Sequence, residues 1–155
     1  MRRQDREVTE ITDLLAILEA CKVCRIGMQD EQGIYIVPVN FGYEYAAGRL
    51  ALFFHSAREG RKIEALSRRP DVGFEMDTGH QLIEGETACE YGYRFQSIIG
   101  SGTASFVEGA EAKQRALDLL MKHQTGQAFA FDDRRVAAIA VVRIDVTAFT
   151  GKIHP

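Results

Sequence analysis

The sequence lacks any apolar run that approaches the roughly 20 residues of a membrane-spanning helix. Its charged start, MRRQDREVTEITD, contains no apolar segment of the kind found in secretory signals. Cysteine is also scarce. The three cysteines, Cys21, Cys24 and Cys89, are too few, and odd in number, to form a disulfide framework. These absences together predict a cytoplasmic protein with no membrane partner.

Glycine-rich phosphate loops of the Walker or dinucleotide type are absent as well, which argues against a nucleoside triphosphate or a Rossmann dinucleotide as ligand. The net charge of −3 does not mark a general nucleic-acid binder, and aromatic and basic residues are not interleaved as a single-strand binder requires. No Pro/Gly/Ser-rich linker divides the chain. Its 155 residues therefore predict one domain, residues 1–155, with an ordinary globular composition.

Two segments have the apolar spacing of amphipathic helices. The first covers residues 10–20, with Thr9 or Thr12 as the candidate N-cap. The second covers residues 111–123, and Gly126 is placed to end it as a C-cap. Both helices are expected to lie on the periphery of the domain.

Strand-like runs rich in β-branched and aromatic residues make up most of the remaining chain. Short connections between them favour antiparallel hairpins, so the sequence predicts a mainly β fold, an antiparallel barrel with peripheral helices. Pro38 cannot donate to a ladder, so its strand should be an edge or carry a bulge. Residues 78–92 are polar and are expected to be a loop with at most a short strand. The runs are residues 22–28, 34–43, 49–55, 71–76, 95–107 and 137–151.

The most informative segment is FFHSAREGRKIEALSRRP, residues 53–70, where a strand should end and a helix begin. Ser56 and Glu59 match a capping box, and Pro70 should end the helix. The free N–H groups at a helix start favour an anion. One interpretation is therefore a phosphate site, and the other is an ordinary capped, solvent-exposed basic helix.

Three cations strengthen the first interpretation. Arg58, Arg61 and Lys62 lie within five residues of one another. Arginine offers phosphate a planar fork and lysine a point charge. The cluster is of a size to hold one phosphate.

These residues resemble the phosphate-binding strand and helix of the FMN-binding split-barrel family, which includes pyridoxamine 5'-phosphate oxidase. Residues 36–43, IVPVNFGY, resemble the family's strand along the flavin ring, and residues 96–107 resemble its later cofactor-contacting strand. The segments MRRQDREVTE, CKVCRIGM, PVNFGYE and HSAREGRKI are most similar to the 5-nitroimidazole resistance (Nim-like) subgroup. The resemblance covers roughly residues 1–152 and implies a six-stranded antiparallel split β-barrel.

The resemblance also implies a cofactor, an assembly and residue roles: FMN, bound at the subunit interface of a homodimer. It places Val39, Asn40 and Phe41 along the ring, His55 beside the flavin, Ser56, Gly60, Arg61 and Lys62 around the phosphate, and Ser97 on the later strand. The chain ends in FTGKIHP and lacks the paired basic residues of the oxidase's substrate-binding end. Oxidation of pyridoxamine phosphate is therefore not expected.

His55 is the candidate catalytic residue, because a histidine beside a flavin could donate or accept a proton. The alternative is a histidine that only hydrogen-bonds the cofactor or nearby backbone. Cys21 and Cys24 form a C-x-x-C without the second ligand pair that zinc requires, so no metal site is expected and both are expected to pack as small half-buried residues. His123 and His154 are expected on the surface.

Three functions stay open from the sequence. The first is an FMN-dependent oxidoreductase of the Nim-like type, acting on an unidentified small molecule. The second is a non-enzymatic flavin-binding or flavin-carrying protein. The third is a binding module for a different phosphorylated ligand or for haem, as a haem-binding split-barrel protein with His55 as the haem ligand.

Overall fold

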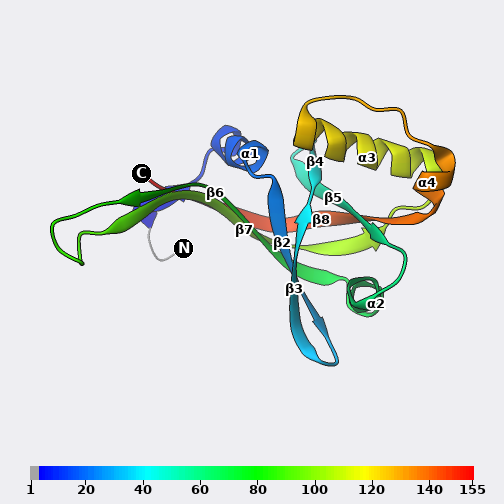
Figure 1. Ribbon diagram of the computed structural model, residues 1–155, viewed down its shortest axis with the longest axis horizontal. Coiled ribbons are helices and arrows are strands. Elements are labelled where there is room, and N and C mark those ends of the chain that lie inside the picture. Colours follow the sequence, from blue (N-terminus) through cyan, green and yellow to red (C-terminus); the bar gives the residue numbers. More distant parts are fainter. Residues whose placement is uncertain (1–3) are drawn as a thin grey trace.

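Eight strands form one antiparallel sheet in the computed structural model of the protein, which describes residues 4–155. The first three residues of the charged N-terminal segment lie outside the described residues. The strand order is β3-β2-β6-β7-β8-β5-β4, and β1 pairs with β8 (Figure 1). The strands are β1 (Glu7–Val8), β2 (Val23–Asp30), β3 (Gly33–Asn40), β4 (Gly42–Ala46), β5 (Arg49–Ala57), β6 (Asp71–Ile83), β7 (Gly92–Phe106) and β8 (Ile139–His154).

A single residue, Phe41, connects β3 to β4, although these strands lie at opposite ends of the strand order. The chain therefore joins the two ends of the sheet at this point and curls it into a barrel. Six of the strands are at least eight residues long, namely β2, β3, β5, β6, β7 and β8. The predicted six-stranded antiparallel split barrel is confirmed, with β1 and β4 as short additions.

Strand β5 is buried on both of its faces. Leu52 and Phe54 belong to the core inside the barrel, whereas Ala51 and Phe53 belong to a second core beneath the helices. This explains why the sequence of β5 is a continuous apolar run and does not alternate with polar residues. Residues 50–54 therefore lie between two packed layers, and the strand then runs out of them, with His55 and Ala57 exposed and Ser56 half-buried.

Four α-helices and one short 3-10 helix accompany the sheet in the described part of the chain. Figure 1 shows α3 and α4 above β4 and β5, α2 beneath them, and α1 near β6 and β7. None of the described helices is long and apolar enough to cross a membrane. The helices are η1 (Gln4–Arg6), α1 (Ile11–Ala20), α2 (Arg61–Arg68), α3 (Ala110–Thr125) and α4 (Asp133–Ala137).

Helix ends differ in part from the sequence predictions. Gly126 is the predicted left-handed C-cap of α3, with a φ of 74°. The N-cap of α1 is Glu10, so the predicted threonine caps are wrong. The predicted capping box of Ser56 and Glu59 is also wrong, because β5 continues to Ala57 and α2 starts only after Gly60.

The hairpin of β6 and β7 extends well beyond the barrel (Figure 1). Residues 78–92 were expected to be a loop, but β6 continues to Ile83 and β7 begins at Gly92. Both faces of these strand ends are largely exposed, so their residues are polar and lack the apolar alternation that predicts a strand. A Cβ on Gly100 would overlap the Phe74 ring, so this glycine lets neighbouring strands approach closely. Pro38 lies on β3, which is an edge strand as predicted.

Cys21 and Cys24 are buried in the barrel core, whereas Cys89 is exposed. Burial raises the pKa of the Cys21 thiol to about 11 and that of Cys24 to about 12. Among the described residues, no cluster of His, Cys, Asp and Glu side chains could hold a metal ion. The C-x-x-C is therefore a pair of packing residues, more deeply buried than expected.

The close contact between β4 and α3 leads to a prediction about stability. A Cβ on Gly42 would overlap backbone atoms of Leu120, so Gly42→Ala should lower the free energy of unfolding by about 1–3 kcal/mol. Gly73→Ala is the matched control, because the nearest atom to its Cβ would be the Gly100 carbonyl oxygen at 3.9 Å. It should change stability by less than about 1 kcal/mol. Urea unfolding measures both, and equal effects would contradict the packing described.

Thiol labelling tests the burial of the C-x-x-C. At pH 8 only about one in a thousand Cys21 thiols and about one in ten thousand Cys24 thiols would be ionised, and the thiolate is the form that reacts. Iodoacetamide should therefore modify one thiol per native chain, Cys89, and three in denaturant. Mass spectrometry of the digested protein counts the modified sites, and rapid native labelling of Cys24 would be inconsistent with the structure.

Candidate functional site

The barrel splits where β4 stops pairing with β5. The last pair of this ladder is Gly42 with Phe53, after which β3 pairs only with β2, and β5 pairs with β8. A continued ladder would have placed Asn40 opposite His55. Residues 39–41 and 54–56 therefore form the two lips of an opening, which we call the split.

One lip of the split presents free backbone. No described strand pairs with the outer edge of β3, so the edge N–H and C=O groups of this strand face the split without a ladder partner. Val39 is buried in the barrel core beneath them. Apolar cover and unpaired backbone donors and acceptors are the surroundings that a flat heterocycle requires.

The predicted phosphate site is at the start of α2. Its N-cap is Gly60, with a φ of 117° and no side-chain cap. A Cβ at Gly60 would meet no atom within 4 Å, so the first turn faces open space. The first N–H groups of α2 therefore have no side-chain acceptor and can bind an anion. Ser56 lies near the end of β5, just before the bend that leads into α2.

The two cations of this turn have different partners. Arg61 donates to both carboxylate oxygens of Asp30, at 2.6 and 3.1 Å, and stacks over the Tyr35 ring at 4.2 Å. These bonds raise the pKa of Arg61 and lower the pKa of Asp30. They occupy two of the five guanidinium N–H groups and leave three for a ligand.

Lys62 makes no ion pair with any residue that the structure describes. Its ammonium group lies 5.5 Å from the centre of the ring of Phe54, a residue of the barrel core. Partial burial lowers the pKa of Lys62, because the charged form loses hydration. A bound anion would restore that stabilisation, so Lys62 is the cation of this site that is most readily available to a phosphate.

His55 lies on the outer face of β5, on the same side as Phe53. It borders a cavity of about 580 Å³ beneath α3 and α4. Its ring has no hydrogen-bond partner within residues 4–155, which leaves both nitrogens available. The structure therefore places the predicted catalytic histidine, which is exposed, between the split and an open, largely apolar pocket.

Ser97 is the one predicted residue that lies away from the others. It is on β7, where it pairs with Asp77 and Lys152. Strands β2 and β6 separate β7 from β3, and β8 separates it from β5. Within one chain, Ser97 is therefore on neither lip of the split.

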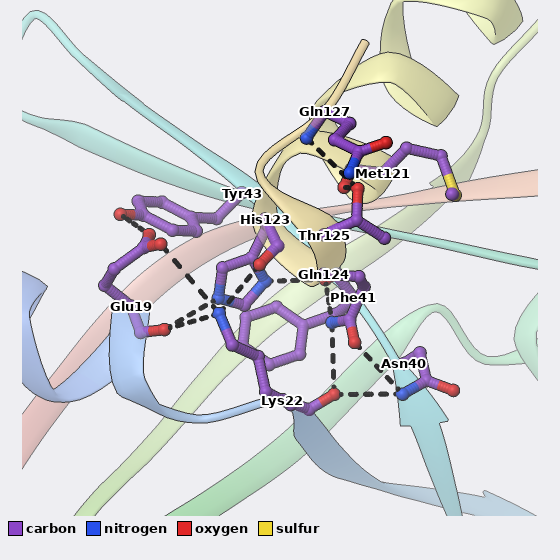
Figure 2. Close-up of polar contacts among 10 residues, drawn as sticks. All are labelled: Glu19, Lys22, Asn40, Phe41, Tyr43, Met121, His123, Gln124, Thr125 and Gln127. Carbon is purple, nitrogen blue, oxygen red and sulfur yellow. Dashed lines mark hydrogen bonds and ion pairs between the residues drawn. The ribbon is translucent and has the colours of Figure 1, made fainter. Parts of the chain in front are cut away.

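Asn40 and Phe41 are held by a polar cluster that joins α1, the connection from α1 to β2, and the end of α3 (Figure 2). The amide nitrogen of Asn40 donates to the Lys22 carbonyl oxygen at 3.1 Å and to Gln124 Oε1 at 3.3 Å. The Phe41 carbonyl oxygen accepts from Gln124 Nε2 at 2.8 Å and contacts His123 Nδ1 at 2.7 Å. The amide nitrogen of Asn40 is thus occupied, and this lip offers a ligand backbone groups and the Asn40 Oδ1.

His123 was expected on the surface, but only 5% of it is exposed. Its Nε2 lies 3.3 Å from the Glu19 carbonyl oxygen, and its ring packs against those of Phe41 and Tyr43. Burial raises the pKa of Tyr43 to about 12, as does its hydrogen bond to Glu19. The sequence contained a signal for this, because His123 follows Leu120 by three residues on the apolar face of α3.

Comparison with known proteins agrees with this architecture. The family described as pyridoxamine 5'-phosphate oxidase matches residues 10–153. No protein with a curated description matches the chain. A solved structure from Bacteroides thetaiotaomicron, described provisionally as a 5-nitroimidazole antibiotic resistance protein, is 34% identical. Its TM-score is 0.82, and the match covers 95% of this chain and 86% of that one.

More distant solved structures share the fold alone. A FAD and heme binding protein from Mycobacterium smegmatis is 17% identical with a TM-score of 0.80, covering 96% of this chain and 73% of that one. A FAD-binding protein from Mesorhizobium loti is 20% identical with a TM-score of 0.68, covering 97% and 98%. The match over residues 10–153 and the 34% identity agree with the resemblance found in the sequence, and the chain belongs to the pyridoxamine 5'-phosphate oxidase family.

Proposed function

We propose that the protein is an FMN-binding flavoprotein, with the FMN phosphate at the start of α2 and the isoalloxazine ring in the split. One observation carries the proposal. The uncapped first turn of α2, with Lys62 lacking an ion pair among the described residues, directly follows the strand that forms one lip of the split. An anion site and one lip of a slot for a flat ring thus lie on one continuous segment of chain.

The residues present fit FMN in both parts. The first turn of α2 and Lys62 supply donors for a single phosphate, and Arg61 keeps three N–H groups free beside Asp30. The free edge of β3 supplies backbone groups for the ring, and Val39 supplies apolar cover. A cluster of this size suits the single phosphate of FMN better than the diphosphate of FAD, the flavin named for two related folds.

Bound FMN would supply one- or two-electron transfer, and the protein would bind and orient it. His55 would then act beside the ring, where its unpartnered imidazole could hold or deliver a proton. We therefore propose an oxidoreductase of the Nim-like type, supported by the 34% identity to the provisional 5-nitroimidazole resistance protein. A flavin carrier without turnover and a haem protein with His55 as ligand are the alternatives.

We further propose a homodimer that covers the split. Large apolar side chains are exposed on β3 and on the projecting β6–β7 hairpin, including Ile34, 80% exposed, and Ile36, 62% exposed. Exposed apolar groups that gather on long strands are typical of subunit interfaces. A second chain would also explain how Ser97 could reach a cofactor from outside its own split. The other members of this exposed set are Leu82, Tyr91, Tyr93 and Ile99.

The first test is the loss of the phosphate contact. Lys62→Ala should weaken FMN binding at least about tenfold, because it removes a charge-assisted contact to the phosphate. Lys122→Ala, which removes an exposed lysine from α3, is the control and should bind as the parent protein does. Fluorescence quenching of FMN measures both affinities.

The visible spectrum decides between the alternatives. If the protein shows no bound-flavin spectrum even after FMN is added, the proposal is ruled out. A Soret band after haem titration, lost in His55→Ala, would favour the haem protein. Repeated reduction of a nitro compound with a nicotinamide donor would exclude a mere carrier.

The assembly is tested by one charge on the exposed face of β3. Ile36→Glu should convert a dimer to a monomer, because a buried carboxylate at the interface would lose its hydration. Ile11→Glu places the same charge at the start of α1, where Ile11 is 37% exposed, and should leave the dimer intact. Analytical ultracentrifugation gives the mass of each variant, and a monomeric parent protein would refute the dimer.

A further inference from the structure

The cavity beside His55 has apolar walls from α3, from the segment that leads into α4, and from the starts of α4 and β8. Strand β5 contributes His55 to the lining of the cavity. Its volume of about 580 Å³ is within the range of small-molecule sites. Two aromatic rings face it from one short segment, which favours a flat ligand over an extended one. The principal apolar lining residues are Leu117, Leu120, Phe129, Phe131 and Ile139.

The polar groups of this lining are unequally occupied. Asp132 is the N-cap of α4, and its Oδ1 accepts from the Arg135 backbone N–H at 3.0 Å. The guanidinium of Arg135 and the ring of His55 make no hydrogen bond within residues 4–155. The five guanidinium N–H groups of Arg135 therefore outnumber the remaining acceptor oxygen of Asp132, Oδ2, as groups that a ligand could reach. This asymmetry favours a ligand with a negative or acceptor group.

We propose that this cavity binds a small planar aromatic carboxylate, with its ring against Phe129 and Phe131 and its carboxylate on Arg135. Guanidinium matches a carboxylate with two parallel N–H donors, which a single charge on lysine would not. Because the cavity adjoins His55, a ligand of this class would be the substrate of the flavoprotein. Only this role as substrate rests on the proposed function. The binding site itself stands on the cavity and its lining.

Binding is tested on the full chain by isothermal titration with 2-naphthoate. The neutral probe 2-naphthalenemethanol has the same ring system without the charge. We expect naphthoate to bind about tenfold more tightly than the alcohol, because a charge-assisted bond replaces a neutral one. Methyl resonances of Leu117 and Leu120 should shift with both probes, which locates the ring.

Two neighbouring arginines of α4 provide a matched pair of variants. Arg135 lines the cavity, whereas Arg134 does not. Arg135→Gln should remove the preference for naphthoate and leave binding of the alcohol unchanged, and Arg134→Gln should keep the preference. Ala130→Trp, at an exposed position of the lining, should abolish binding of both probes by filling the cavity.

Equal affinity for the two probes, or equal effects of the two arginine variants, would overturn the proposal. So would probe binding that survives in Ala130→Trp while its far-UV circular dichroism matches the parent. An FMN titration of the parent protein separates the two proposals. Arginine-dependent naphthoate binding by a protein that takes no FMN would support the site and reject the flavoprotein, whereas FMN binding without naphthoate binding would do the reverse.

Discussion

The architecture depends on the chain passing from one end of the sheet to the other at Phe41. Strand β3 ends at Asn40 paired with β2, and β4 begins at Gly42 paired with β5. The Phe41 side chain is buried in the core, and its carbonyl oxygen is held by His123 and Gln124. Because the backbone turns here, the ladder to β5 cannot continue, and the barrel stays open on one side. The split is therefore a consequence of how one residue is anchored.

Helix α3 connects this anchor to the cavity. Its C-terminal residues hold Phe41, its middle packs on Gly42, and Leu117 and Leu120 form part of the cavity wall beside His55. A ligand in the cavity and a ring in the split would therefore both contact elements positioned by the same helix. The segment after Gly126, which carries both cavity-lining phenylalanines, starts where α3 ends.

The two adjacent cations at the start of α2, Arg61 and Lys62, have different roles. Arg61 ties the helix to Asp30 of the β2–β3 hairpin, and Arg68 makes a second pair with Glu31. Exposed pairs of this kind contribute about 0–1 kcal/mol each, so they orient the helix more than they stabilise it. Lys62 points toward Phe54. Of two adjacent cations, one thus positions the helix and the other remains for a ligand.

Local patterns in the sequence determined the antiparallel barrel, the Gly126 cap and the edge position of Pro38, because these follow from apolar periodicity and backbone chemistry. The basic residues Arg61 and Lys62 beside a helix start were also predicted, although the start was placed four residues too early, at Ser56. Only the tertiary structure decided that Asp30 engages Arg61, that His123 is buried, that α2 has no capping box and that Ser97 lies away from the split. Each of these depends on which distant segments meet, and no local pattern encodes such a meeting.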